Sequence, residues 1–94
     1  MAQQWKKKQL QPVSGPEKAF GQALREIREK RKLSQERLAL DAGFDRTYIS
    51  LIERGVRSPT VRAVVRLAEV LKVRPSEIVR RMEAHLAGRQ KYTK

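Results

Sequence analysis

The chain has 94 residues, and its 22 lysines and arginines against 10 aspartates and glutamates give a formal net charge of +12. This length makes one small domain, and this charge favours polyanionic partners, namely nucleic acid or an anionic membrane surface. Cysteine is absent and no uninterrupted apolar run exceeds three residues, so the sequence excludes disulfides, thiolate metal sites and a membrane-spanning helix.

Residues 1–16 are predicted to form a basic arm outside the folded domain. The segment MAQQWKKKQLQPVSGP holds Lys6, Lys7 and Lys8, has no acidic residue, and spaces its few apolar groups without helical periodicity. No apolar run follows the lysines, so a signal peptide is not expected. A shorter basic tail is predicted at 88–94, which leaves 17–87 as the folded domain.

Helical periodicity runs through the rest of the chain and predicts five helices, an all-α fold. The first helix is expected at about 17–32. The second follows Ser34, which is a good N-cap, and Leu33 is expected to pack on Leu38. It ends at Gly43, because glycine adopts the left-handed conformation at little cost.

The last three helices have their own start and stop signals. Asp45 is expected to cap the third helix and Gly55 to end it; Pro59 and Thr60 start the fourth, and Pro75 is the first residue of the fifth. The predicted core residues of the third and fourth helices are Ile49, Ile52, Val61, Val64, Leu67, Ala68 and Leu71. The fifth helix carries the apolar residues Ile78, Val79, Met82 and Leu86.

The second and third helices have the spacing of a helix-turn-helix, whose second helix lies in the DNA major groove. A small residue, Ala39, stands where two helices must approach closely, Gly43 makes the turn, and Ile49 and Ile52 anchor the second helix from beneath. These positions lie 4, 8, 14 and 17 residues beyond Gln35.

The polar residues of the third helix lie opposite its two isoleucines, at about 100° of rotation per residue. They are Arg46, Thr47, Ser50 and Arg54. Arginine donates to guanine O6 and N7, and hydroxyl groups can donate or accept. This face is therefore predicted to read DNA, whereas an ordinary solvated helix face is the alternative.

From Phe20 to Val79 the sequence closely resembles the Cro/repressor-type (XRE-type) helix-turn-helix family of phage and bacterial regulators. The stretches that carry the resemblance are FGQALREIREKRKLSQERLA, AGFDRTYISLIERGVRSP and LAEVLKVRPSEIV. The string DRTYIS followed by IERG is similar to the small controller proteins of restriction–modification systems. The resemblance implies a compact five-helix, lambda-repressor-like domain with its motif at 35–54 and its recognition helix at 45–54.

The resemblance also implies a function, sequence-specific double-stranded DNA binding by a small prokaryotic transcriptional regulator of the repressor or controller type. It assigns base contacts to Arg46, Thr47, Ser50 and Leu51, phosphate contacts to Gln35, Tyr48, Arg54 and Arg57, and an internal salt bridge to Arg28 and Glu53. Leu51 could equally be a core or dimer-contact leucine, and an exposed Arg28–Glu53 pair would contribute almost nothing. Relatives often place serine where this chain has Arg74, so the cap of the last helix is weaker here.

Other classes of function find less support in the sequence. An enzyme is not expected, because there is no cysteine or glycine-rich phosphate loop and the single histidine, His85, has only Glu83 at ligand-like spacing. No cofactor and no metal site are predicted. A membrane binder would need a basic helix with bulky aromatic residues opposite, and a non-specific binder would explain the charge but not the motif. The remaining alternative is an antitoxin-like DNA-binding protein that also binds a protein partner.

The predicted partner is therefore double-stranded DNA, with a palindromic operator read by a homodimer, because one recognition helix covers too few base pairs. The dimer is expected to form through the last helix, around Ile78, Val79, Met82 and Leu86. The basic arm either follows the duplex or stays in solvent. The expected location is the cytoplasm, as a bacterial or phage-encoded protein, which fits the lack of cysteine.

Overall fold

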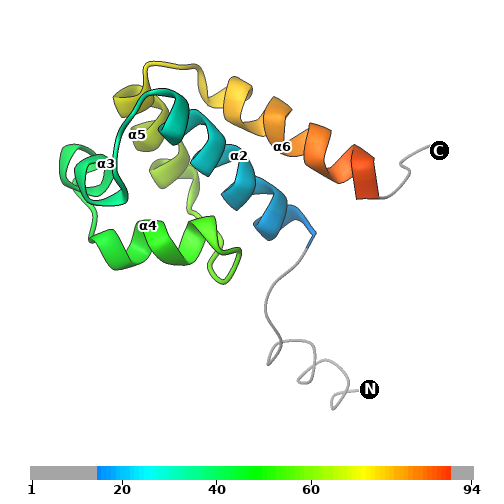
Figure 1. The fold of residues 1–94 in the computed structure, drawn as a ribbon, viewed down its shortest axis with the longest axis horizontal. Helices are drawn as coiled ribbons and strands as arrows, with labels where there is room; N and C mark the ends of the chain where they lie inside the picture. The colour runs from blue at the N-terminus through cyan, green and yellow to red at the C-terminus, as the bar shows by residue number, and fades with distance from the viewer. Residues whose placement is uncertain (1–14, 90–94) are drawn as a thin grey trace, which may run out of the picture.

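The computed structural model describes residues 15–89, and in this range it forms five α-helices and no strand (Figure 1). The helices are α2 (Pro16–Lys30), α3 (Gln35–Ala42), α4 (Arg46–Glu53), α5 (Val61–Leu71) and α6 (Pro75–Arg89). The predicted all-α fold is confirmed. The lysines of the expected arm, Lys6 to Lys8, and most of the basic tail lie outside the described residues.

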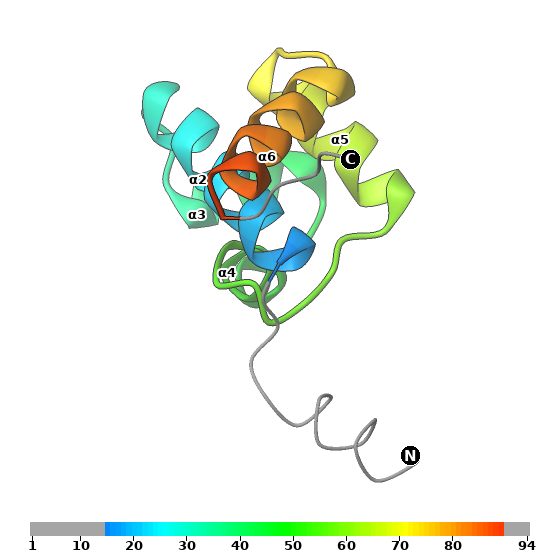
Figure 2. The same cartoon turned by 90° about the vertical axis from the view of Figure 1, so that its right-hand side faces the viewer.

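Helix α2 lies at the centre of the fold, with α6 along one side and α4 along another, while α3 packs against α4 and α5 (Figures 1 and 2). The side chains between these helices form one apolar cluster, to which all five contribute. Its fully buried large members are Leu24, Leu38, Ile49, Ile52, Leu67, Leu71 and Ile78. Each such side chain contributes about 1.5–3 kcal/mol by leaving water, so this cluster fixes where α3 and α4 sit.

The start and stop signals read from the sequence act largely as expected. The Ser34 hydroxyl accepts a hydrogen bond from the Arg37 amide at 2.9 Å, and the Thr60 hydroxyl accepts one from the Ala63 amide at 3.0 Å. Gly43 is left-handed, with φ of 81°, and the Phe44 amide donates to the Ala39 carbonyl at 2.8 Å to close α3. These caps pair backbone groups that a helix end would otherwise leave open.

Two expectations about the helix ends are wrong, and a third holds. The first helix stops at Lys30, because Lys32 adopts a left-handed conformation with φ of 59°. Asp45 occupies the N-cap position of α4, but its carboxylate accepts no hydrogen bond there and is exposed. The last helix starts at Pro75 as predicted, and the Arg74 backbone carbonyl accepts a hydrogen bond from the Glu77 amide in place of a serine cap.

The core prediction fails at Val61, which is 82% exposed although it continues the apolar stripe of its helix. Val79, expected near a dimer contact, is 38% exposed. Val61 is the first residue of α5 and points nearly opposite to Ala63, which is buried. Ile78 and Leu86 of α6, expected at a dimer contact, are instead buried in the protein's own core.

Candidate nucleic-acid interface

Helix α4 runs along an outer edge of the molecule, next to α3 (Figure 1). Its apolar side is closed, since Ile49 and Ile52 have no exposed surface. Its outer side carries Arg46, Thr47 and Arg54, which are exposed, and Ser50, which is half-buried. The four polar side chains predicted to share a face are therefore brought to the accessible side of α4.

The turn between α3 and α4 is tied to α5. The Arg66 Nε atom donates to the Ala42 carbonyl at 3.0 Å, which places a cation at the C-terminal end of α3, where the helix dipole favours it. A Cβ at Gly43 would lie 3.3 Å from the end of that same arginine side chain. The angle at which α4 leaves α3 thus depends on a contact from outside the motif.

A glycine in the middle of α2 lets α4 approach its backbone. A Cβ built at Gly21 would lie 2.3 Å from the Ile52 carbonyl oxygen and 2.6 Å from the Glu53 carbonyl oxygen, so no larger residue fits without moving a helix. Sequence reasoning did not single out this residue. The signal was present, because glycine inside a helix costs about 1 kcal/mol and usually has a packing reason.

Arg28 and Glu53 form the expected ion pair, and it is buried, with each residue 8% exposed. Arg28 Nε donates to Glu53 Oε2 at 2.6 Å and Nη2 donates to Oε1 at 2.9 Å, a bidentate geometry. Arg28 Nη1 also donates to the Leu33 carbonyl at 2.8 Å. The hydrogen bond to Glu53 raises the pKa of Arg28 despite opposing burial. The pair joins α2, the loop before α3 and the end of α4.

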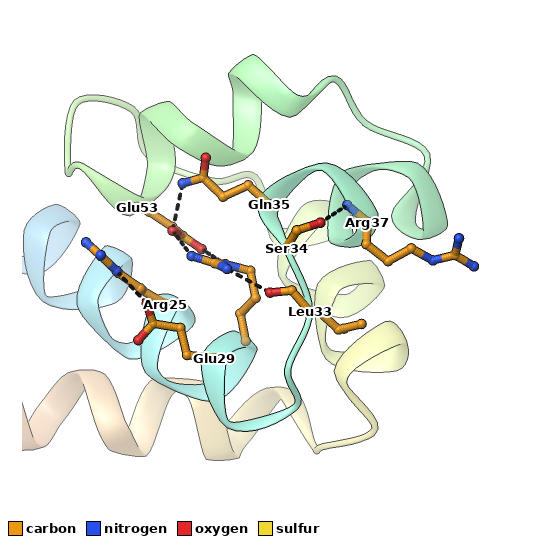
Figure 3. A network of polar contacts seen from close by, with 8 residues as sticks. Arg25, Glu29, Leu33, Ser34, Gln35, Arg37 and Glu53 are labelled. Carbon is orange, nitrogen blue, oxygen red and sulfur yellow. Dashed lines mark hydrogen bonds and ion pairs between the residues drawn. The ribbon is translucent and has the colours of Figure 1, made fainter.

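Gln35, the first residue of α3, belongs to the same network (Figure 3). Its side-chain Nε2 donates to Glu53 Oε1 at 2.9 Å. The amide must face this way, because an ionised carboxylate only accepts hydrogen bonds. Nε2 carries a second N–H group, and the backbone amides at the start of α3 have no intrahelical acceptor. Gln35 therefore holds α4 in place while donors remain for an anion such as a DNA phosphate.

Tyr48 is held between two side chains at the edge of the exposed face. Its ring lies 5.0 Å from the Phe44 ring, centre to centre, and the Arg57 guanidinium lies 5.3 Å from the Tyr48 ring centre. Cation–π contacts of this kind contribute about 0.5–1 kcal/mol at exposed sites. Arg57 is thus positioned beside α4, with Tyr48, Leu51 and Thr47 lining the same shallow hollow.

The loop that carries Arg57 is fixed by its backbone. The Leu51 carbonyl accepts hydrogen bonds from the Val56 amide at 3.0 Å and the Arg57 amide at 3.2 Å. Gly55 has φ of 77°, and a Cβ there would lie 2.8 Å from the Lys18 Cα atom, so both conformation and space require glycine. Leu51 itself is half-buried, so its side chain is partly accessible beside Thr47.

The described residues offer little for other chemistry. No group of three or more metal-ligating side chains occurs within 15–89, and no helix in that range is long and apolar enough to cross a bilayer. Glu53, one of the ten acidic residues of the sequence, has its negative charge neutralised by Arg28. What the exposed side of α4 presents is a guanidinium group, two hydroxyl groups and further arginines, which are hydrogen-bond donors suited to base edges and phosphates.

Comparison with known proteins identifies the same region. A family model described as helix-turn-helix matches residues 24–78. The control protein C.BamHI of Bacillus amyloliquefaciens is 41% identical over 61 residues, which cover 64% of this chain and 75% of that protein. The HTH-type transcriptional repressor RghR of Bacillus subtilis is 43% identical over 56 residues, 58% of this chain and 42% of the repressor. Among solved structures, the restriction-modification controller protein C.AhdI from Aeromonas hydrophila has a TM-score of 0.64 and 43% identity, over 65% of this chain and 92% of that one.

Proposed function

The chain belongs to the helix-turn-helix family of DNA-binding transcription regulators, and we propose that it reads a specific duplex by placing α4 in the major groove. The observation that carries this proposal is the asymmetry of α4. Its apolar side is fully buried, whereas Arg46 and Thr47 at its start are exposed and make no side-chain hydrogen bond within residues 15–89.

In this proposal Arg46, Thr47, Ser50 and Leu51 contact base edges. Arg46 donates to guanine O6 and N7, the two hydroxyl groups donate or accept, and Leu51 packs on a thymine methyl group. The exposure of Arg46 and the partial exposure of Leu51 support these roles, because both side chains are accessible on α4.

Phosphate contacts are proposed for Gln35, Tyr48, Arg54 and Arg57. Gln35 starts a helix, where unpaired backbone amides and the positive end of the dipole favour an anion. Arg57 and Tyr48 stand together beside α4, and Arg54 is exposed at its end. Such contacts fix the register of the protein on the duplex without reading sequence.

We further propose that two copies of the chain bind a palindromic operator, with half-sites about 34 Å apart. One α4 reaches too few base pairs to specify a genomic site, and a two-fold dimer doubles the number read. DNA in the cytoplasm would be the target. Nothing in the described residues favours the alternative of an added toxin partner, so the regulator is the function we propose.

Selection of bound sites from random duplex DNA tests the proposal. We expect one enriched motif with dyad symmetry, because each α4 reads one half-site in opposite orientation. An enriched motif without dyad symmetry would contradict the proposed dimer but would still support sequence-specific binding by α4. A selected pool indistinguishable from the starting pool would overturn sequence-specific binding altogether.

A further inference from the structure

Arg66 belongs to α5, outside the helix-turn-helix, yet its side chain reaches the turn between α3 and α4. Helix α5 packs against α3 (Figure 1), and Arg66 Nε donates to the Ala42 carbonyl at 3.0 Å. Ala42 is the last residue of α3, and only residues 43–45 separate it from Arg46, the first residue of α4. A donor from α5 therefore holds the chain just before the proposed base contacts begin.

The two ends of α4 are held in different ways. At its last residue, the Glu53 carboxylate accepts hydrogen bonds from Arg28 and Gln35. Before its first residue, Asp45 occupies the N-cap position without making a side-chain cap hydrogen bond. The position of the first turn of α4 therefore depends on how the preceding turn is fixed, and Arg66 holds that turn from outside the motif.

Gly43 brings the turn close to the Arg66 guanidinium. Gly43 is left-handed, and a Cβ built on it would lie 3.3 Å from Arg66 Nη2. The Phe44 amide already pairs with the Ala39 carbonyl at 2.8 Å. Arg66 adds a partner for the Ala42 carbonyl, one of the acceptors that a helix end leaves open. The guanidinium thus lies against the backbone of the turn itself rather than against a neighbouring side chain.

We propose that Arg66 is a positioning residue for DNA reading, which acts through Arg46 at the start of α4. By fixing the turn, Arg66 fixes where the Arg46 side chain stands against the bases, and it contacts no base itself. Recognition groups must be held within about 0.5 Å of their working geometry, so a small displacement of the start of α4 loosens the choice of sequence. The inference rests on the proposed function and deepens it, because it adds a determinant of specificity outside the helix-turn-helix.

Two simpler roles for Arg66 predict different outcomes. As a cap alone, Arg66 would stabilise the fold by placing a cation at the negative end of the α3 dipole, and its loss would leave the sequence preference unchanged. As an exposed arginine that contacts a DNA phosphate, its loss would weaken binding to every duplex equally. The direct contact with the turn favours a positioning role, which predicts a larger loss on the preferred duplex than on random DNA.

Arg66→Met in the full chain is the first test, because it removes the donors and the charge while keeping an unbranched apolar side chain. Arg62→Met is the matched control. Arg62 lies about one turn earlier on α5, is exposed, and makes no side-chain hydrogen bond or ion pair within residues 15–89. Both variants lose one positive charge. Fluorescence anisotropy measures the affinity of each for the duplex enriched by selection and for a random duplex, and the ratio of the two affinities is the preference.

We expect Arg66→Met to lower the preference about three- to tenfold, near the low end of what the loss of a base contact costs, and Arg62→Met to leave it unchanged. The two variants should bind the random duplex equally, because they carry the same charge. Their melting temperatures should be close, since Arg66 is exposed and water can take over its hydrogen bond. Equal losses on both duplexes would overturn the inference in favour of a phosphate contact. A lowered melting temperature with the preference intact would overturn it in favour of a cap alone.

The same substitution in the Arg46→Ala background tests whether Arg66 acts through Arg46. There Arg66→Met should have little further effect on the remaining preference, because the residue that it positions is gone and coupled residues are not additive. An undiminished effect in that background would overturn the inference. Wild type that binds both duplexes equally would overturn the proposed function and this inference with it. Wild type that discriminates, with Arg66→Met discriminating as well as Arg62→Met, would overturn this inference alone.

Discussion

The buried residues of α4 and its exposed residues differ in how far each depends on the rest of the fold. Glu53 accepts three side-chain hydrogen bonds, two from Arg28 and one from Gln35. Arg46 and Thr47 lie within two turns of it on the same helix, and their side chains make none among residues 15–89. The buried, paired Glu53 ends this eight-residue helix and the exposed Arg46 begins it, so stability and the proposed recognition are carried by different residues of one helix.

The separation has a physical reason. A group that must meet a base edge has to keep its donors free, whereas a buried charge must be fully paired. The described structure leaves no buried side-chain nitrogen or oxygen unpaired. Variants of the buried residues should therefore change unfolding, and variants of the exposed residues should change DNA binding alone.

The largest effect is expected for Glu53→Gln. The variant leaves the Arg28 guanidinium buried without an anion, so we expect the free energy of unfolding to fall by about 3–5 kcal/mol. Small domains have only about 5–15 kcal/mol in total. Chemical denaturation of both proteins measures the difference. Glu29→Gln is the control, because its pair with Arg25 is exposed and should change stability by less than about 0.5 kcal/mol. Equal curves for Glu53→Gln and wild type would show that the network is not stabilising.

Gly21→Ala should destabilise the same contact between α2 and α4, from the α2 side. Alanine normally stabilises a helix relative to glycine by about 0.5–1 kcal/mol, but here the new methyl group meets two backbone oxygens. We expect a loss of about 1–3 kcal/mol, since neither oxygen can rotate away. Gln22→Ala, at the next and exposed position, should stabilise slightly. A gain of stability in Gly21→Ala would mean that α2 and α4 are not in close contact.

On the exposed side, Arg46→Ala should cost about 1–3 kcal/mol of binding to the preferred duplex and relax the preference at one base position. Its melting curve should match that of wild type. Arg57→Ala should instead weaken binding to specific and random duplexes alike, because phosphate contacts carry no sequence information. Fluorescence anisotropy with both duplexes measures the split. Equal losses of binding to the two duplexes for Arg46→Ala would show that Arg46 contacts the DNA phosphates rather than a base.

Much of this division between buried and exposed residues could be predicted from the sequence, because it follows from local rules. Ser34, Gly43 and Thr60 act at the positions where cap preferences place them, and Ile49 and Ile52 point away from the polar face as helical periodicity demands. The base and phosphate roles given to Arg46, Gln35 and their neighbours stay predictions.

The failures occur where the outcome depends on a distant neighbour. Helical periodicity predicts which residues form an apolar stripe, but not how much of that stripe the neighbouring helices cover. Val61 was therefore assigned to a core that ends before it. In the same way Ile78 and Leu86 were assigned to a dimer contact, although α2 and the core already cover them. Residue type placed Asp45 at an N-cap but could not fix the direction of its carboxylate.

The smallest effect should come from Glu26, a half-buried acid that sharpens the contrast with the buried Glu53. Its carboxylate lies 3.3 Å from Arg81 Nη1 and 3.0 Å from His85 Nε2, and so joins α2 to α6. Burial pushes the pKa of Glu26 upward, but the hydrogen bonds and charges of His85 and Arg81 outweigh it and lower that pKa.

A lowered pKa means that the contacts of Glu26 with Arg81 and His85 stabilise the fold above the unfolded-state pKa. This contribution disappears as pH falls through the folded-state pKa. Because the side chain is 42% exposed, we expect Glu26→Gln to cost only a few tenths of a kcal/mol at neutral pH, and less at high salt. Thermal melts of both proteins from neutral to acidic pH should give melting temperatures that converge once Glu26 is protonated. A difference in melting temperature that persists or widens in acid would show that the carboxylate stabilises the fold through packing rather than charge.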